Sequence, residues 1–309
     1  MWKRFNAALA TEKSEWCGAF RFTLSLVEKE TKDREMVIVP QEGSFEAEVN
    51  GKTYAGSRIG GPFAMGPGKT NASALYVPCN AKLRIRGKGE VAFFEAPALR
   101  EKPPFYFPAS EAKVLVRGDW IWRRDIVNLV NPKDASTNLV VGETCSPPGF
   151  WSGTPLHVHD KDNPAAGESD MEEVYYHRLN LKTPAGSQFD AFGVQLLFDG
   201  SRMMKSYVLG DKSVVAIPGG AHPVAASPVC ELLYLWGLGG KGTDLLMRDL
   251  PEFKHLKPFE AVSQALRKGM ATKVVTAAEF DALCAPYGFT EEQKALLKVM
   301  LKDQNVRIG

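Results

Sequence analysis

Short strand-like runs separated by glycine and proline fill the chain up to about residue 250, and this pattern constrains the fold most. In "SFEAEVNG" (44–51), Phe45, Ala47 and Val49 alternate with two glutamates, as on a strand with one face in solvent. The Asn-Gly pair at 50–51 is typical of a two-residue hairpin turn. The pattern therefore predicts an all-β fold built from antiparallel strands.

The strand pattern occurs twice. A strand ending in proline, "ALYVP" (74–78), stands in the first half, and a matching one, "VVAIP" (214–218), stands in the second. Each is followed by a further hydrophobic strand, as expected for two related barrels in tandem that leave few open sheet edges. A chain of 309 residues with 44% hydrophobic side chains is long enough for both. We expect one barrel over 1–112 and a second over 113–257.

Helical spacing replaces the strand pattern over 258–309. Thr276 with Glu279 and Thr290 with Gln293 form capping-box patterns, and Gly288 stands where a helix is expected to end. The sequence predicts a C-terminal helical extension packed on the barrel or on a second subunit, so a homo-oligomer is an open alternative. A lid over an active site is the other alternative.

Composition excludes several classes of partner. The net charge of +2, without a basic stripe, gives no electrostatic basis for binding nucleic acid. No apolar run approaches 18 residues and the first residues lack a signal-peptide core, so we expect no membrane contact and a cytoplasmic location. Five scattered cysteines without a CxxC pair predict reduced thiols rather than a zinc ribbon.

Three of the five histidines lie in "TPLHVHDKDNPAAGESDMEEVYYHRL" (154–179). His157 and His159 are two residues apart, so on a strand both imidazoles point to the same side. Glu173 begins the next strand, with Glu172 as the competing carboxylate, and His222 follows a Gly-Gly turn. Three imidazoles and one carboxylate suit a divalent ion such as Zn, Mn, Fe, Co or Ni, with positions left open for substrate.

The order H-x-H, then E, then a later H resembles the metal pattern of the cupin superfamily. More specifically, "PLHVHDKD", "MEEVYYHRL" and "VVAIPGGAHPV" resemble the 5-deoxy-glucuronate isomerase family of inositol catabolism, over about residues 18–250. The first half is similar to that family's degenerate N-terminal cupin. The Trp236-Gly237 pair is shared with the related 5-keto-4-deoxyuronate isomerases. The resemblance implies a tandem cupin whose metal ligands are His157, His159, Glu173 and His222.

The resemblance also implies an activity, an aldose–ketose isomerisation of a uronic acid such as 5-deoxy-glucuronate through an enediol. The sequence departs from the family in two places. Gln195-Leu196 stands where the family has Gln-Arg, and Trp120 and Ile121 replace a glycine and an asparagine. These departures bear on the exact substrate more than on the metal site.

An isomerase site needs a base, and strand alternation suggests where to look. If Glu173 points into the barrel, then Tyr175 and His177 share its face and are the candidate catalytic residues. Gln195, a polar residue on an otherwise apolar strand, is a candidate for substrate binding.

A sugar acid also requires a cation for its carboxylate. Arg124 and Arg178 are the candidate substrate-binding cations, and Lys205 is a third.

Two other function classes remain open on the sequence. The same ligand set can hold Fe(II) in a cupin dioxygenase, and a bicupin can also act as a non-enzymatic sugar-binding or regulatory protein.

Overall fold

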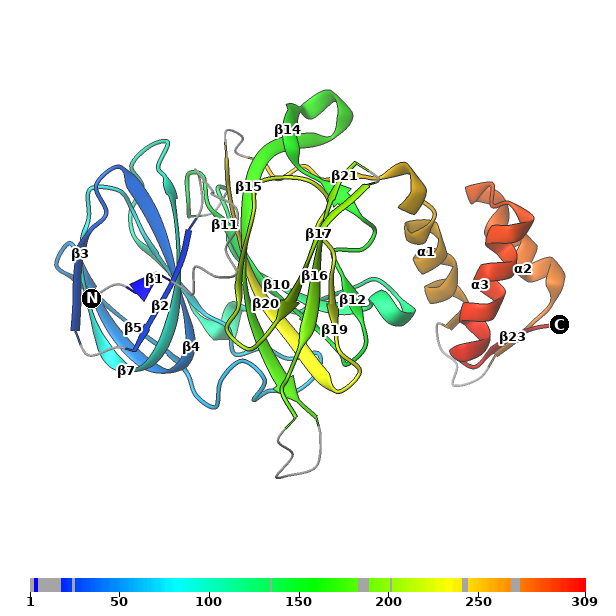
Figure 1. The fold of residues 1–309 in the computed structure, drawn as a ribbon, viewed down its shortest axis with the longest axis horizontal. Coiled ribbons are helices and arrows are strands. Elements are labelled where there is room, and N and C mark those ends of the chain that lie inside the picture. Colours follow the sequence, from blue (N-terminus) through cyan, green and yellow to red (C-terminus); the bar gives the residue numbers. More distant parts are fainter. Residues whose placement is uncertain are drawn as a thin grey trace.

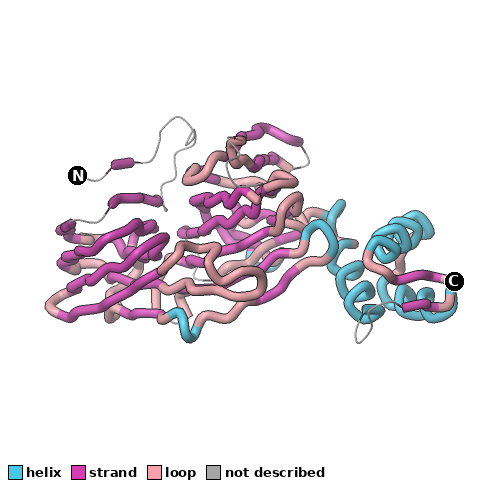
Figure 2. The backbone as a smooth tube through the Cα atoms, turned by 90° about the horizontal axis from the view of Figure 1, so that it is seen from below, coloured by secondary structure: helices cyan, strands magenta, loops and turns pink. Residues whose placement is uncertain are grey.

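A computed structural model describes residues 3–4, 18–23, 26–133, 135–182, 189–200, 202–240, 244–267 and 273–309, so Cys17 lies outside the described residues. Two β-structures and a group of helices lie in a row along the molecule (Figure 1). Figure 2 shows the same order from below, with helix concentrated beside the C-terminus.

The first β-structure is an eight-stranded sheet with the central order β1-β2-β7-β4-β6-β8, in which β3 also pairs with β7 and β5 with β4. Its strands are β1 (Lys3–Arg4), β2 (Gly18–Thr23), β3 (Leu26–Glu30), β4 (Arg34–Val49), β5 (Lys52–Arg58), β6 (Ala74–Val77), β7 (Lys82–Pro97) and β8 (Phe105–Phe107). The β4–β5 hairpin turns at Asn50 (φ 50°) and Gly51 (φ 82°), as the Asn-Gly pair predicts.

The second β-structure pairs a seven-stranded sheet with a four-stranded one. The larger sheet has the order β14-β15-β20-β11-β10-β9, with β18 paired to β15, and the smaller has the order β12-β19-β16-β17. The strands of the larger sheet are β9 (Leu115–Arg117), β10 (Arg124–Val130), β11 (Val140–Ser146), β14 (Asp160–Asn163), β15 (Glu168–Leu181), β18 (Val214–Ile217) and β20 (Cys230–Gly240). The remaining strands are β12 (Trp151–Ser152), β16 (Gly193–Asp199), β17 (Arg202–Leu209) and β19 (Val224–Ala226), with β13 (His157–Val158) paired to β21 (Arg248–Asp249).

The three largest apolar clusters among the described residues of the β-structures hold these structures together. One lies inside the first barrel and includes Phe45, Leu83 and Phe93. A second joins the two barrels, because Phe94 of β7 and Tyr176 of β15 belong to the same buried cluster. The third lies inside the second barrel, between its two sheets. The seven-stranded sheet therefore has one face toward the first barrel and the other toward its own interior.

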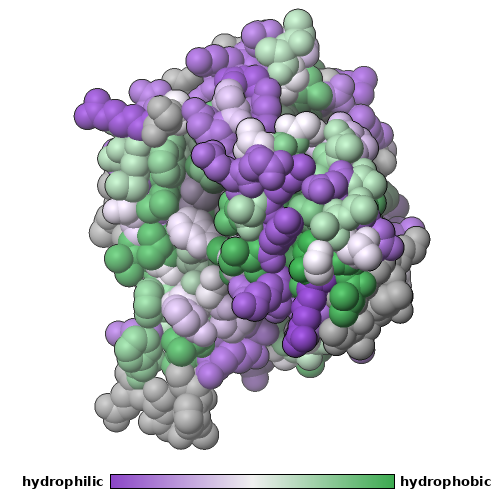
Figure 3. Space-filling view, turned by 90° about the vertical axis from the view of Figure 1, so that its right-hand side faces the viewer, coloured by the Kyte–Doolittle hydropathy of each residue, from purple (hydrophilic) through white to green (hydrophobic). Residues whose placement is uncertain are grey.

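The C-terminal helices form a small module with its own core. Its elements are α1 (Leu256–Arg267), β22 (Lys273–Val275), α2 (Ala277–Cys284), η5 (Ala285–Tyr287), α3 (Glu291–Asp303) and β23 (Val306–Ile308). The short helices elsewhere are η1 (Ala109–Glu111), η2 (Trp120–Trp122), η3 (Pro164–Ala166) and η4 (Pro251–Phe253). The module's core also takes in Trp122 of η2, so the helices are joined to the second barrel of the same chain. The face in Figure 3, seen from the right-hand side of Figure 1, mixes hydrophilic and hydrophobic side chains.

The sequence-based expectations for the fold are confirmed in their main points. Both capping boxes form, at Thr276 and at Thr290, and Gly288 adopts the left-handed conformation that ends the second helical segment. The structure is mainly β with a helical C-terminal part, although α1 begins two residues before the predicted position. The division into barrels at residue 112 stays a prediction. No described helix has both the length and the apolarity needed to cross a membrane.

Candidate metal centre and adjoining cavity

Three histidines from separate parts of the second barrel converge on one point. His157 lies in β13, His159 follows it, and His222 comes after the turn that ends β18. One ring nitrogen of each lies within 4.8 Å of the others. This spacing suits the binding of a single metal ion by three imidazoles.

The backbone fixes the orientation of each imidazole. Every Nδ1 is bonded to a carbonyl oxygen and so carries the proton, which leaves Nε2 as the free ligand atom. The bonds join His157 to Pro155 (2.8 Å), His159 to Met171 (3.0 Å) and His222 to Gly220 (2.7 Å). Carbonyl partners of this kind are the usual outer support of metal-binding histidines.

Glu173 brings a carboxylate to the same point from β15. Its Oε2 lies 2.8 Å from Nε2 of His222 and 3.3 Å from Nε2 of His159. Burial alone would raise the pKa of Glu173, but the contacts with the two imidazoles outweigh it and lower the pKa to about 2. Of the two competing carboxylates, Glu173 is the one that meets the histidines, since strand alternation turns Glu172 to the other side.

The protonation of the cluster is compatible with a metal ion. Burial, together with the neighbouring His222 and His159, lowers the pKa of His157 to about 3, so this imidazole is neutral at pH 7. Nε2 of His222 is buried and has no hydrogen-bond partner among the described residues, despite its short distance to Glu173. Burial alone would lower the pKa of His159, but its contacts with Glu173 outweigh burial and raise the pKa, so a divalent cation that binds here would displace the proton of this imidazole.

A cavity of about 260 Å³ adjoins the cluster, just below the roughly 300 Å³ at which ligand pockets commonly begin. Its walls come mainly from β9, β10, β11, β15 and β20. The lining includes His157, His159, Glu173, Tyr175, Arg117, Arg124, Asn128, Thr144, Tyr234, Trp236, Leu115 and Met247. None of the described lining residues belongs to α1, α2 or α3, so the helical extension is not a lid in this structure.

Tyr175 is the only one of the two candidate catalytic residues that lines this cavity. Its ring lies 5.6 Å from that of His222 and 4.4 Å from that of Tyr234, between centroids. Burial, the Glu173 carboxylate and Tyr234 raise its pKa well above 10. Tyr175 therefore stays protonated at neutral pH and is a hydrogen-bond donor rather than a base.

His177 lies two residues after Tyr175 on the same face of β15 and is fully buried. Its ring is 5.8 Å from that of Tyr175, and its Nδ1 donates to the carbonyl of Ser213 (3.1 Å). Burial lowers its pKa to about 4, and the contacts with Ser213 and Gln195 offset this only in part. The imidazole is therefore neutral at pH 7.

Gln195 supports the backbone beside the cluster. Its amide nitrogen donates to the carbonyls of His222 (2.7 Å) and Pro223 (3.1 Å), and the side chain is fully buried. The residue is not among those that line the cavity. Its position favours a role in holding the His222 segment in place.

The three candidate cations lie in different surroundings. Arg124 of β10 lines the cavity with the histidines. Arg178 points to the other side of β15 and pairs with Asp211 at 3.0 Å, away from the cavity. Lys205 is exposed on the strand β17 and is also absent from the described lining. The structure thus brings together Arg124 and the metal cluster, and separates the other two from it.

Two residues beside the site were not predicted from the sequence. Asp160 accepts a hydrogen bond from the backbone N–H of Gly220 (2.6 Å), whose carbonyl orients His222. Gly220 has φ 81°, and a Cβ there would lie 1.9 Å from the carbonyl oxygen of Phe198. Arg117, opposite Arg124 in the β9–β10 pairing, is the second. Only its place in the "VRG" segment could have drawn attention to it.

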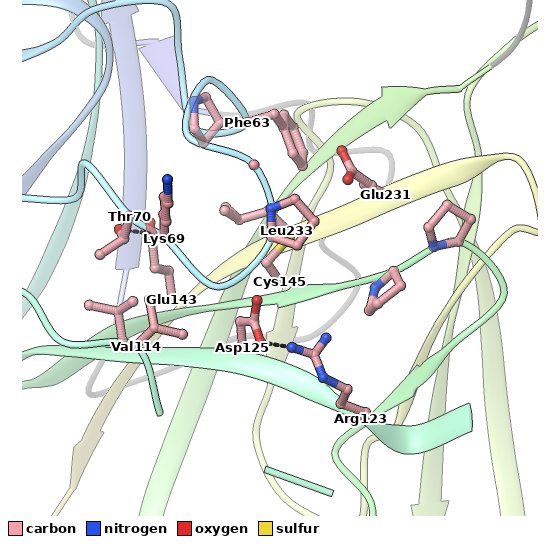
Figure 4. A pocket seen from close by; sticks show the side chains of 16 residues that line it. Phe63, Lys69, Thr70, Val114, Arg123, Asp125, Glu143, Cys145, Glu231 and Leu233 are labelled. Carbon is pink, nitrogen blue, oxygen red and sulfur yellow. Dashed lines mark hydrogen bonds and ion pairs between the residues drawn. The ribbon is translucent and has the colours of Figure 1, made fainter. Parts of the chain in front are cut away.

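A second cavity, of about 160 Å³, lies on the other face of the same strands (Figure 4). Its acidic groups already have partners. Asp125 accepts from Arg123 (2.9 Å) and from the backbone of Gly68 (2.7 Å), and Glu143 accepts from Thr70 (3.2 Å). These pairings satisfy the carboxylates of Asp125 and Glu143 within the protein, and we assign no function to this cavity.

Two β-barrels in one chain, the second holding three imidazoles and a carboxylate around one point, define a bicupin with a candidate metal centre. The chain belongs to the KduI/IolB family, whose model matches residues 25–256. This confirms the family resemblance described from the sequence.

Curated relatives agree with this assignment. A 5-deoxy-glucuronate isomerase of Geobacillus kaustophilus is 33% identical over 215 residues, which are 69% of this chain and 74% of that protein. The 5-deoxy-glucuronate isomerase of Bacillus subtilis strain 168 is 28% identical over 216 residues, or 69% and 76% of the two chains. The family places the chain among isomerases.

Solved structures share the fold. An IolB-like protein from Salmonella typhimurium LT2 matches with a TM-score of 0.70 and 24% identity, covering 79% of this chain and 90% of that one. An oxalate decarboxylase of Bacillus subtilis with Mn(II) centres matches with a TM-score of 0.52 and 10% identity, covering 92% and 78%. Both likenesses support the tandem cupin fold.

Proposed function

We propose that this protein is a metal-dependent isomerase that interconverts the aldose and ketose forms of a uronic acid, with 5-deoxy-glucuronate as the first candidate substrate. The convergence of three histidines and Glu173 on the wall of a cavity that also contains an arginine carries the proposal. The names of the curated relatives support the choice of substrate class.

In this proposal His157, His159, His222 and Glu173 hold a divalent ion. The donor set suits Zn, Mn, Fe, Co or Ni. When bound, the ion acts as a Lewis acid that stabilises the negative charge developing on the substrate oxygens. The open side of the cluster faces the cavity, where a substrate carbonyl and the neighbouring hydroxyl have room to approach.

The reaction removes a proton from the carbon beside the carbonyl and returns one to the former carbonyl carbon. We assign Tyr175 to the reacting oxygens, because its raised pKa keeps the phenol protonated and able to donate to an enediolate. His177 lies behind it as a neutral imidazole and is the candidate group for accepting the proton. Gln195 then acts through the backbone of His222 rather than on the substrate.

Arg124 is the proposed partner of the substrate carboxylate. It lines the same cavity as the metal cluster, and no described acid forms an ion pair with it. A guanidinium in this position can form two parallel hydrogen bonds with a carboxylate.

The test is metal analysis combined with a substrate screen. The protein is stripped with a chelator, reloaded separately with each of the five metals, and incubated with 5-deoxy-glucuronate, glucuronate or 4-deoxy-5-ketouronate in deuterated water. We expect metal-dependent turnover of at least one sugar acid, with deuterium incorporated at the isomerising carbons, as followed by NMR. Turnover that consumes oxygen would instead identify an iron dioxygenase. A metal-loaded protein that converts none of the three acids overturns the proposed substrate class.

A further inference from the structure

Two arginines lie side by side at the cavity, and no described acid forms an ion pair with either, although the charge of Glu260 on α1 acts favourably on Arg124. Arg124 and Arg117 stand directly opposite each other in the β9–β10 pairing, and both line the cavity. Their hydrogen bonds within the described structure go to backbone carbonyls, from Arg124 to Trp122 (3.2 Å) and from Arg117 to Val116 (3.2 Å). Two adjacent guanidinium groups repel each other, so the pair favours an anion bound between them.

The segment that connects these arginines is attached to the C-terminal helices. The backbone N–H of Gly118 donates to Glu260 of α1 (3.1 Å), and Arg267 at the end of α1 donates to the buried carboxylate of Asp119. Trp122 of η2 is buried in the core of the helical module. Gly118, Asp119 and Trp122, all between β9 and β10, are therefore held by contacts with α1 and with the core of the helical module.

The backbone between Gly118 and Arg124 is closely packed. Gly118 has φ 75°, and a Cβ there would lie 2.2 Å from the carbonyl oxygen of Trp122 and 2.9 Å from Nη1 of Arg124. Asp119 caps the start of η2 by accepting from the N–H of Trp120 (2.8 Å), and η2 ends two residues before Arg124. We therefore expect a displacement of this turn to move the guanidinium.

We propose that Arg117 and Arg124 form a two-arginine subsite for the carboxylate of the ligand, and that the C-terminal helical module is the positioning element of this subsite. The proposal rests on the sugar-acid reaction proposed above and names the group that recognises the acid. The family match ends at residue 256, where α1 begins, so the family does not assign this role to the module. The helices would thus act on ligand binding from outside the cavity.

The experiment measures carboxylate recognition both by binding and by turnover. Calorimetry on the metal-loaded full-length protein compares glucuronate with glucose, which has the same ring without the carboxylate. Kinetic constants are measured with the best substrate from the screen. We expect wild type to prefer glucuronate, and Arg124→Ala to weaken glucuronate binding about 10- to 100-fold without affecting glucose. Arg117 is exposed, so we expect a smaller loss of about 3- to 10-fold for Arg117→Ala.

The module is tested with variants that do not touch the cavity. Glu260→Ala and Arg267→Ala should raise KM and the glucuronate Kd about 3- to 10-fold while kcat stays within about 2-fold, because a displaced guanidinium binds less well. Glu260→Gln and Arg267→Lys keep an acceptor and a cation, so they should restore binding. Arg307→Ala, at an exposed position on β23 of the same module, is the matched control and should behave as wild type. Thermal unfolding and metal content identify any variant that fails to fold.

The outcomes separate this proposal from the proposed reaction. Turnover with unchanged KM and Kd in all four alanine variants overturns the subsite and leaves the isomerase standing. Glucuronate binding that depends on the arginines and on α1, without any turnover, supports the subsite and overturns the isomerase. Equal binding of glucose and glucuronate by wild type overturns the subsite, and loss in the arginine variants alone overturns the role of the helices.

Discussion

The two barrels differ in the side chains that fill their interiors. The first is filled by apolar side chains such as Phe45, Leu83 and Phe93, all nearly inaccessible to solvent. The second carries His159, Glu173 and other polar groups at equivalent depth beside its apolar core. None of the five histidines lies in the first half of the chain. The interior of the first barrel is thus a packed apolar core, whereas part of the interior of the second consists of the polar side chains of the candidate metal site.

The packed barrel also supports the back of the site. Arg58 of β5 forms a bidentate ion pair with Glu143 of β11, at 2.8 Å for each bond, and both side chains are buried. Glu143 faces the first barrel, and its neighbour Thr144 faces the cavity and accepts from Trp236 (3.0 Å). The first barrel therefore sets the position of a strand that lines the cavity.

The largest expected effect comes from removing ligands in the second barrel. His157→Ala combined with His222→Ala should abolish stoichiometric metal binding and lower turnover by at least about 100-fold, more than the loss of a single outer-shell partner. Plasma mass spectrometry and the isomerase assay measure the two effects. Phe93→Ala in the first barrel is the contrasting variant, because it should cost about 3–5 kcal/mol of stability and leave the metal bound. Near-normal turnover in the double histidine variant would defeat the metal-based mechanism.

The second effect concerns the contact between the barrels. Arg58→Ala leaves Glu143 charged and buried without its main partner, which should cost about 3–5 kcal/mol in the free energy of unfolding. Chemical denaturation measures this cost. The exposed pair of Arg84 and Glu28 has the same 2.8 Å separation, with side chains 57% and 63% exposed, and Arg84→Ala should cost no more than about 1 kcal/mol. Equal decreases in the free energy of unfolding for Arg58→Ala and Arg84→Ala would show that burial does not make the Arg58–Glu143 pair more important for stability.

The sequence reveals the candidate ligands, which the structure brings together, more readily than it reveals the groups that support them. Local sequence patterns are enough to predict the candidate ligands: strand alternation indicates the H-x-H pair and the glutamate, and a glycine turn indicates the later histidine. Arg178 has the wrong strand parity for the cavity, since its neighbour His177 shares the face of Glu173. The position of Arg178 away from the cavity could therefore have been predicted from strand parity. The ion pair of Arg58 with Glu143 was not predictable, because the two residues are 85 positions apart and meet only when the two barrels dock.

The third effect is the loss of stability at acidic pH, which we expect to come in part from His177 of the second barrel. Its folded pKa of about 4 lies below the usual 6.5, so the unfolded chain takes up the proton first as the pH falls. The stabilising effect of the neutral imidazole is present above about pH 6.5 and is lost between pH 6.5 and 4, an effect of about 3 kcal/mol. Urea unfolding of metal-free protein at several pH values measures it. We expect a shallower pH dependence for His177→Asn, which keeps a donor for Ser213, and an unchanged slope would contradict this account.

The smallest expected effect concerns the hydrogen bond from Gly220 to Asp160, which supports the candidate metal site in the second barrel. Asp160→Ala frees the turn whose carbonyl orients His222, so metal affinity should fall about 10- to 100-fold, as for other outer-shell partners. Competition with a chelating dye measures the affinity. Asp160→Asn keeps a side-chain oxygen for the bond and should recover most of it, while Asp162→Ala, exposed on the same hairpin, should have no effect. If Asp160→Ala binds metal as tightly as Asp162→Ala, the hydrogen bond from Gly220 to Asp160 does not support the site, and the imidazole of His222 is held by the rest of its own loop.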